Sequence, residues 1–217
     1  MGGGAVWYTS FMGIQRMLRS FRTAIAALVV VMIVLQGCSH DSPCIPCEPD
    51  QCTGNPVVVI ETTMGDMTIE LFARESPISV GNFLLYVHDD FYDGLIFHRV
   101  IRSFVIQGGQ YDENLQKKPA RDPIPCEADN GLSNKRGTIA MARTSDINSA
   151  TSQFFINVRD NPALDHNMVE FGYAVFGRVI AGLSVVDSIE VVETTNVNGF
   201  HDVPVEPVII SDIRRLQ

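Results

Sequence analysis

The chain has 217 residues, 46% of them hydrophobic and 19% charged, and carries a formal net charge of −9. This length suffices for one substantial domain with additional segments. Residues 1–37 contain three arginines and no acidic residue, so the remainder is more acidic still. Nucleic acid binding requires a basic face, so the acidic charge of the chain excludes nucleic acid as a partner. The acidic surface indicates no partner by itself, because such surfaces commonly serve solubility.

Residues 1–37 have the pattern of a targeting segment. Arg19 and Arg22 precede an apolar run over residues 24–35. The run is shorter than the about 20 apolar residues that cross a bilayer, and it is typical of a secretory signal peptide. We therefore expect residues 1–37 to be a signal peptide. Met17 is an alternative start, because it would open a signal of ordinary length.

The end of this segment resembles a bacterial lipoprotein signal. Residues 35–38 read Leu-Gln-Gly-Cys, and by this resemblance Cys38 would be acylated and become the first mature residue. Plain secretion and an uncleaved anchor are the alternatives. Ser39 stands where an aspartate would favour the inner membrane. The resemblance therefore implies a lipid anchor in the cell envelope facing the periplasm, with the outer membrane favoured, although a Gram-positive host stays open.

Residues 38–56 have the composition of an extended tether, with four prolines and few large apolar residues. Besides the acylated position, the chain has four cysteines, which allow three pairings that the sequence does not distinguish. They are Cys44, Cys47, Cys52 and Cys126. An exported location favours disulfides. Cys44 and Cys47 lack the strand-to-helix setting of a redox pair and the further ligands of a zinc site, so a structural clip is favoured.

The folded domain is expected over residues 57–217. Alternating and β-rich runs predict strands, and apolar residues at helical spacing predict two helices. A helix of about three turns follows Ser76 as the N-cap, with Pro77 at its first position, and the second helix covers residues 183–189. The expected strands are residues 57–62, 67–71, 95–100, 104–107, 137–143, 153–158, 173–180 and 208–213. This pattern is typical of a mainly β fold with a closed antiparallel barrel.

Residues 97–109 form the most informative stretch, Phe-His-Arg-Val-Ile-Arg-Ser-Phe-Val-Ile-Gln-Gly-Gly. It places Arg99 on one alternating run, and the aromatic Phe104 and the amide of Gln107 on the next run. A permanently charged donor beside an apolar pocket suits a neutral substrate with one reactive amide. The stretch resembles the signature of the cyclophilins, the peptidyl-prolyl cis/trans isomerases. It departs from that signature at Arg102 and Ser103, where the family usually has Pro-Gly.

Three further blocks resemble cyclophilins in the right order, namely residues 137–143, 152–156 and 171–179. Together the blocks span nearly everything from residue 57 onward. This version of the family sequence is similar to that of the periplasmic bacterial cyclophilins. The resemblance implies a closed eight-stranded antiparallel barrel capped by two α-helices. It also implies peptidyl-prolyl isomerase activity that assists the folding of exported proteins.

Isomerisation of an X–Pro bond needs no nucleophile. Rotation about the amide faces a barrier of about 18–20 kcal/mol because of its C–N double-bond character. A catalyst has to favour the twisted state, in which the proline nitrogen can accept a hydrogen bond. Arg99 is the best donor in the motif, because its guanidinium is always charged and its fork is rigid. The bond accelerates exchange only if it is stronger in the twisted state than in the planar one.

By matched position, the resemblance implies catalytic roles for Arg99, Phe104 and Gln107. Gln107 would bond the substrate carbonyl and hold Arg99 in place. The proline ring would sit among apolar side chains, and the peptide would meet backbone groups of residues 142–143. The implied substrate-binding residues are Val105, Ala142, Arg143, Gln153, Phe155, Leu164 and Tyr173. Three of them depart from common family choices: Val105 replaces a methionine, Arg143 an asparagine and Tyr173 a histidine.

The expected partners are proline-containing polypeptides of the cell envelope, bound by a monomer without a cofactor. The histidines show no ligand spacing, so no metal site is expected, and His98 is interpreted as a hydrogen-bonded core histidine. Ala163 stands where eukaryotic members often have the tryptophan that contacts cyclosporin. Weak cyclosporin binding is therefore expected.

Two other functions are compatible with the sequence. One is a lipid-tethered, non-catalytic proline-binding or chaperone module, which the altered residues Arg102, Ser103 and Ala163 favour. The other is a redox role for the Cys44 and Cys47 pair. Loss of isomerisation in an Arg99→Ala variant would distinguish an enzyme from a pure binding module.

Overall fold

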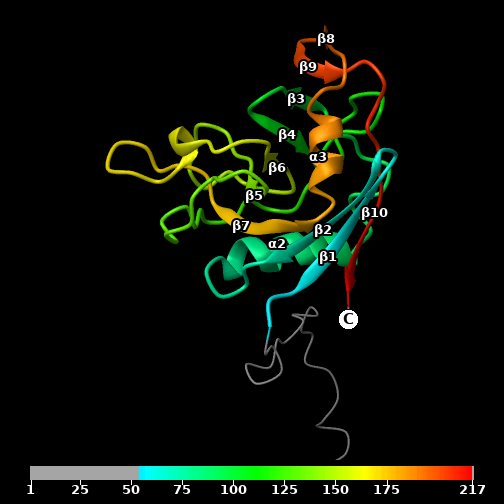
Figure 1. Ribbon diagram of the computed structural model, residues 1–217. Coiled ribbons are helices and arrows are strands. Elements are labelled where there is room, and N and C mark those ends of the chain that lie inside the picture. The colour runs from blue at the N-terminus through cyan, green and yellow to red at the C-terminus, as the bar shows by residue number, and fades with distance from the viewer. Residues whose placement is uncertain (1–53, 217) are drawn as a thin grey trace, which may run out of the picture. The chain divides into compact units, whose positions relative to one another are not determined.

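The computed structural model describes residues 54–216, and these build one mixed but mainly β unit (Figure 1). Eight strands form one sheet in the order β10-β1-β2-β7-β5-β6-β4-β3, and every neighbouring pair is antiparallel. The strands are β1 (Val57–Thr62), β2 (Gly65–Leu71), β3 (Arg99–Ile101), β4 (Val105–Gly108), β5 (Thr138–Met141), β6 (Phe154–Asn157), β7 (Val175–Ala181) and β10 (Ile210–Leu216). The predicted mainly β fold with two helices is confirmed.

The sheet is an open, curled half-barrel, so the expected closure of the barrel was wrong. The edge strands β3 and β10 share no ladder. Where the two edges approach each other, the described chain has a single isolated bridge between Ile96 and Ile209, both outside the strands. The physical reason is that the two edges meet only briefly: backbone hydrogen bonds join residues 94–97 to residues 208–210 and stop before β3 begins, so no continuous ladder closes the sheet.

The core lies on the concave face of the sheet and is covered by two helices, α2 (Pro77–His88) and α3 (Leu183–Ile189). Along β2 the side chains of Met67, Ile69 and Leu71 are fully buried, as expected where alternate residues face one side of a sheet. The ring of Phe83 on α2 lies 5.3 Å from that of Phe176. The helix is thereby fixed to the inner face of the sheet.

The N-terminus of α2 is completed by a residue far away in the chain. Ser76 occupies the N-cap position as predicted, but its hydroxyl donates to the Val175 carbonyl at 2.7 Å and makes no capping bond. The Glu127 carboxylate accepts from the backbone N–H groups of Ile78 and Ser79 at 3.0 and 2.7 Å. A carboxylate satisfies free N–H groups at a helix start and complements the helix dipole, so Glu127 serves as the cap.

A second, two-stranded sheet, β8 (Thr194–Val197) with β9 (Phe200–Pro204), was not predicted. Every residue of β8 is exposed, so the strand has no alternation of apolar residues. In Figure 1 this hairpin follows α3 and lies beyond β3. Cys38, predicted to be acylated, and Cys44, Cys47 and Cys52 lie outside the described residues. Cys126 is half-buried and is the one cysteine of residues 54–216, so the disulfide pairing stays open.

Candidate active site

The candidate site lies on the outer face of the sheet, opposite the core. Strand register places five residues in one row across five neighbouring strands. These are Arg99, Gln107, Phe155, Ala140 and Val175. The next row, which is fully or almost fully buried in the core, contains Val100, Ile106, Ile156 and Ile139. Because successive residues of a strand face opposite sides, the same strands build the core and the site.

A separate apolar cluster forms the floor and walls of this site. Four of its members are buried, namely Val105, Ala140, Phe155 and Val175. Around them pack Phe72, Phe104, Leu132, Ala142, Leu164 and Tyr173. The cluster therefore brings together every apolar side chain that was predicted for the proline pocket. The rings of Phe155 and Tyr173 meet edge to face at 5.6 Å, a favourable aromatic geometry that fixes one wall.

A chain of three glutamines holds Arg99 beside this cluster. Nη1 of Arg99 donates to Oε1 of Gln107 at 3.3 Å. Nε2 of Gln107 donates to Oε1 of Gln153 at 2.9 Å, and Nε2 of Gln153 donates to Oε1 of the buried Gln110. None of the four ion pairs within residues 54–216 involves Arg99. The guanidinium is thus held by a neutral amide and keeps its charge uncompensated.

His98 is buried directly behind this arginine, with 5% of its surface exposed. Burial, and secondly the charge of Arg99, lower the pKa of His98 from 6.5 to about 4. The imidazole is therefore neutral at neutral pH. The prediction of a core histidine agrees with its burial, but Nδ1 has no hydrogen-bond partner among the described residues.

Three buried asparagines, which sequence reasoning missed, support both sides of the pocket. Nδ2 of Asn161 donates to the Phe104 carbonyl at 2.9 Å and to Oδ1 of Asn157 at 2.7 Å. Nδ2 of Asn157 donates to Oδ1 of Asn134 at 3.2 Å, and Nδ2 of Asn134 donates to the Leu164 carbonyl at 3.0 Å. Buried amide networks are rigid when their groups are satisfied. This one links two pocket residues that are far apart in sequence.

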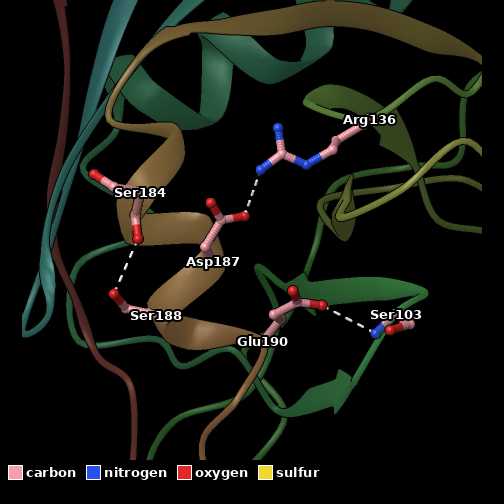
Figure 2. Close-up of polar contacts among 6 residues, drawn as sticks. All are labelled: Ser103, Arg136, Ser184, Asp187, Ser188 and Glu190. Atoms are coloured by element: carbon pink, nitrogen blue, oxygen red, sulfur yellow. Dashed lines mark hydrogen bonds and ion pairs between the residues drawn. The ribbon is translucent and has the colours of Figure 1, made fainter.

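The turn between β3 and β4 carries Phe104 and is tied to helix α3. Ser103 has a φ of 56°, a left-handed conformation that glycine adopts more easily than other residues. Its N–H donates to the Glu190 carboxylate at 3.0 Å. Figure 2 shows Glu190 reaching from the end of α3 toward Ser103, and Asp187 of the same helix pairing with Arg136. An external bond therefore holds the turn in its less favoured conformation.

Arg143 uses its side chain differently from the backbone role that was predicted for residues 142–143. Its Nε and Nη2 both donate to the Gly172 carbonyl, at 3.0 and 2.8 Å. The guanidinium also lies 4.7 Å from the centre of the Tyr173 ring, within cation–π distance. Arg143 thus fixes the aromatic wall. The Ala142 N–H already donates to the Gln153 carbonyl at 3.0 Å.

Two clefts border the apolar cluster, and Arg143 lines both. One cleft of about 550 Å³ lies on the side of Gln107 and Gln153. The other, of about 780 Å³, lies on the side of Leu164 and Tyr173. The apolar cluster is therefore bordered by open space on both sides.

Two kinds of feature are absent from residues 54–216. In this part of the chain, no group of three or more His, Cys, Asp or Glu residues is placed to hold a metal ion. No helix within the same range combines the length and apolar character required to span a membrane.

Comparisons with known proteins identify the family of this chain. The family model for cyclophilin type peptidyl-prolyl cis-trans isomerases matches residues 57–215. Peptidyl-prolyl cis-trans isomerase A of Dickeya dadantii is 49% identical over 157 residues, which cover 72% of this chain and 83% of that protein. Peptidyl-prolyl cis-trans isomerase cyp18 of Streptomyces antibioticus is 51% identical over 162 residues, covering 73% of this chain and 98% of the relative.

A solved structure shows the same fold. The crystal structure of a Cryptosporidium parvum cyclophilin type isomerase in the presence of the dipeptide Ala-Pro has a TM-score of 0.65 and 29% identity. The match covers 74% of this chain and 99% of that one. With relatives at about half identity all named as isomerases, the chain belongs to the cyclophilin-type peptidyl-prolyl cis-trans isomerases.

Proposed function

We propose that this isomerase works by a hydrogen bond from Arg99 to the nitrogen of a proline held in the apolar cluster. The observation that supports the proposal is the placement of an uncompensated guanidinium at the edge of that cluster, fixed by Gln107 at 3.3 Å. No nucleophile, metal or cofactor takes part in the proposed step. The amide twists, its nitrogen lone pair is released from resonance, and the charged donor binds it.

The energy of this step comes from the difference between two states of the amide. In the planar state the nitrogen lone pair is delocalised and accepts no hydrogen bond, whereas in the twisted state it is a good acceptor. A donor placed in advance for the twisted state lowers the barrier without tightening ground-state binding. A preference of about 1.4 kcal/mol for the twisted state over the planar state increases the rate about tenfold.

The test is isomerisation of an Ala-Pro peptide by exchange NMR with wild type, Arg99→Ala and Arg99→Lys. We expect Arg99→Ala to lower kcat/KM by about 10²–10³, as for the loss of one donor to a transition state. Lysine should restore only part of the rate, because it is a point charge without a rigid fork. The matched control is Arg102→Ala, which removes an exposed arginine from the adjacent turn and should leave the rate unchanged.

Two results would contradict the proposal. A folded Arg99→Ala protein with wild-type rate would show that another group acts on the nitrogen. A folded wild type without any acceleration would favour the non-catalytic proline-binding module instead.

We also propose that the natural substrates are exported polypeptides in the cell envelope. The support is the signal-like segment over residues 1–37 and the tether over residues 38–56. An extended tether would let the isomerase domain reach chains at some distance from the membrane surface.

A further inference from the structure

The cleft beside Gln107 has a charge that is opposite to that of the molecule. Its lining includes three cationic side chains and no acidic one, although the chain as a whole carries a net charge of −9. The cations are Lys117, Arg121 and Arg143. The remaining lining residues are neutral. A cleft with a single sign of charge concentrates ligands of the opposite sign.

Two of these three charges are not neutralised within the described chain. Arg121 pairs with Asp89, whereas Lys117 and Arg143 take part in none of the four ion pairs of residues 54–216. Arg143 is held by the carbonyls of Gly172 and Thr144. Carbonyls satisfy its N–H donors but leave its positive charge uncompensated.

The cleft is continuous with the candidate active site. Gln107, which bonds Arg99, and Ala142, which packs on the apolar cluster, both line it. An extended chain advances about 3.3–3.6 Å per residue, so a peptide with its proline in the cluster would place a side chain one or two residues away in this cleft.

We propose that this cleft selects substrates with an acidic side chain, Asp or Glu, within two residues of the isomerised proline. The proposal rests on the proposed function, because it takes the apolar cluster as the proline site. Lys117 would meet the carboxylate in the open part of the cleft, and Arg143 would do so at the boundary with the proline pocket. A basic side chain at the same place would be disfavoured by the same charges.

The test compares peptides that carry Glu, Gln or Lys at each of the two positions before and the two positions after proline. Isomerisation is measured by exchange NMR at low and high salt, and dissociation constants are measured by titration. At one or more positions we expect kcat/KM for Glu to exceed that for Lys by about three- to tenfold at low salt, the size of a partly exposed charge interaction. The ratio should shrink at high salt, where exposed charges are screened.

Two variants test whether the Glu-to-Lys ratio of kcat/KM depends on the charges of the cleft. Lys117→Gln should lower the Glu-to-Lys ratio at least about twofold at low salt. Arg215→Gln removes the same charge from an exposed position on β10 and should leave the ratio unchanged. A ratio close to one at every position, or equal effects of both variants, would overturn the proposal.

The titrations separate this proposal from the catalytic one. If the protein binds Glu-containing peptides more tightly than Lys-containing ones but accelerates none of them, the acidic preference stands and the proposed catalysis fails. If an Ala-Pro peptide is isomerised rapidly and neither rate nor affinity depends on charge, the catalysis stands and the acidic preference fails.

Discussion

His98 and Arg99 are neighbours in sequence with opposite roles. Arg99 points to the outer face of the sheet, whereas His98 is buried behind it. The low pKa of His98, caused first by burial and then by the Arg99 charge, keeps the imidazole neutral. A protonated imidazole would place a second positive charge next to the guanidinium, so a neutral His98 leaves Arg99 as the one charge at that point of the site.

This burial makes folding stability depend on pH. The unfolded histidine binds a proton below about pH 6.5, but the folded one does so only below about pH 4. The free energy of unfolding should therefore be highest above pH 6.5 and decrease as the pH falls toward 4, by about 2 kcal/mol between pH 7 and pH 4.5. Urea unfolding at these pH values should show a smaller decrease for His98→Gln. The control His201→Gln, at an exposed position, should retain the wild-type decrease, and equal decreases in all three proteins would contradict the interpretation.

The site residues that could be predicted from sequence are those that belong to a local pattern. Arg99, Phe104 and Gln107 lie within nine residues on a hairpin, so their proximity follows from strand alternation. The asparagine network could not be predicted in this way. Its members come from two loops and the end of β6, and asparagine in a loop ordinarily indicates a turn. Their meeting depends on the packing of the whole sheet.

At the scale of elements, helix α3 is tied to two segments, the β3–β4 turn and the residues ahead of β5. Glu190, at the C-cap of this helix, holds the β3–β4 turn through Ser103, and Asp187 pairs with Arg136 ahead of β5 (Figure 2). Both contacts are solvent-exposed, so each is expected to contribute modestly to stability. Their effects on the site should differ, because only the Glu190 contact holds the turn that carries Phe104.

We expect Glu190→Ala to lower kcat/KM severalfold while reducing stability by about 0.5–1 kcal/mol. Glu190→Gln should restore most of the activity, because its amide oxygen can still accept the Ser103 N–H. Asp187→Ala is the matched control: it breaks a contact of the same helix at similar cost but does not touch the turn. Peptide isomerisation and urea unfolding measure both quantities. Equal losses of kcat/KM in Glu190→Ala and Asp187→Ala would show that the contact between Glu190 and the turn does not determine the activity.

Strand ends and the last hairpin show where sequence patterns are insufficient. The expected strand over residues 95–100 is reduced to β3, because residues before it bond to the loop carbonyls of Tyr111 and Val208. The turn of the hairpin β8–β9 could have been predicted from the sequence. Asn198 and Gly199 both have positive φ, at 51° and 83°, and Asn-Gly is the preferred pair for a tight hairpin turn.

At the scale of the whole molecule, the family blocks correctly predicted the fold class, but not the closure of the barrel. Closure depends on whether the first and last edges form hydrogen bonds along their length, and among the described residues these bonds join residues 94–97 to residues 208–210 and stop before β3. Edge strands invite pairing with other chains unless they are short or covered. The three-residue β3 and the bridge at Ile96 and Ile209 limit this risk on one edge.

The lipid anchor that the sequence resemblance implies predicts a modification at one defined cysteine. When the full chain is expressed in a bacterium fed with labelled palmitate, the wild type should incorporate label and Cys38→Ser should not, because the thiol is the acylation site. Cys44→Ser removes a cysteine from the same segment and should keep the label. An unlabelled wild type, or label retained in Cys38→Ser, would refute the anchor.

The start of α2 has a consequence for how the protein is made. Its N–H groups are bonded by Glu127, and Ser76 beside them is bonded to Val175. When residue 88 is added to the growing chain, neither Glu127 nor Val175 has been synthesised, so the 12-residue helix initially lacks its cap, and such short helices are marginal on their own. The nascent chain should therefore stay unfolded until most of the domain exists. An unfolded chain is the form that a secretion channel accepts, so the late completion of this helix start is compatible with the proposed export.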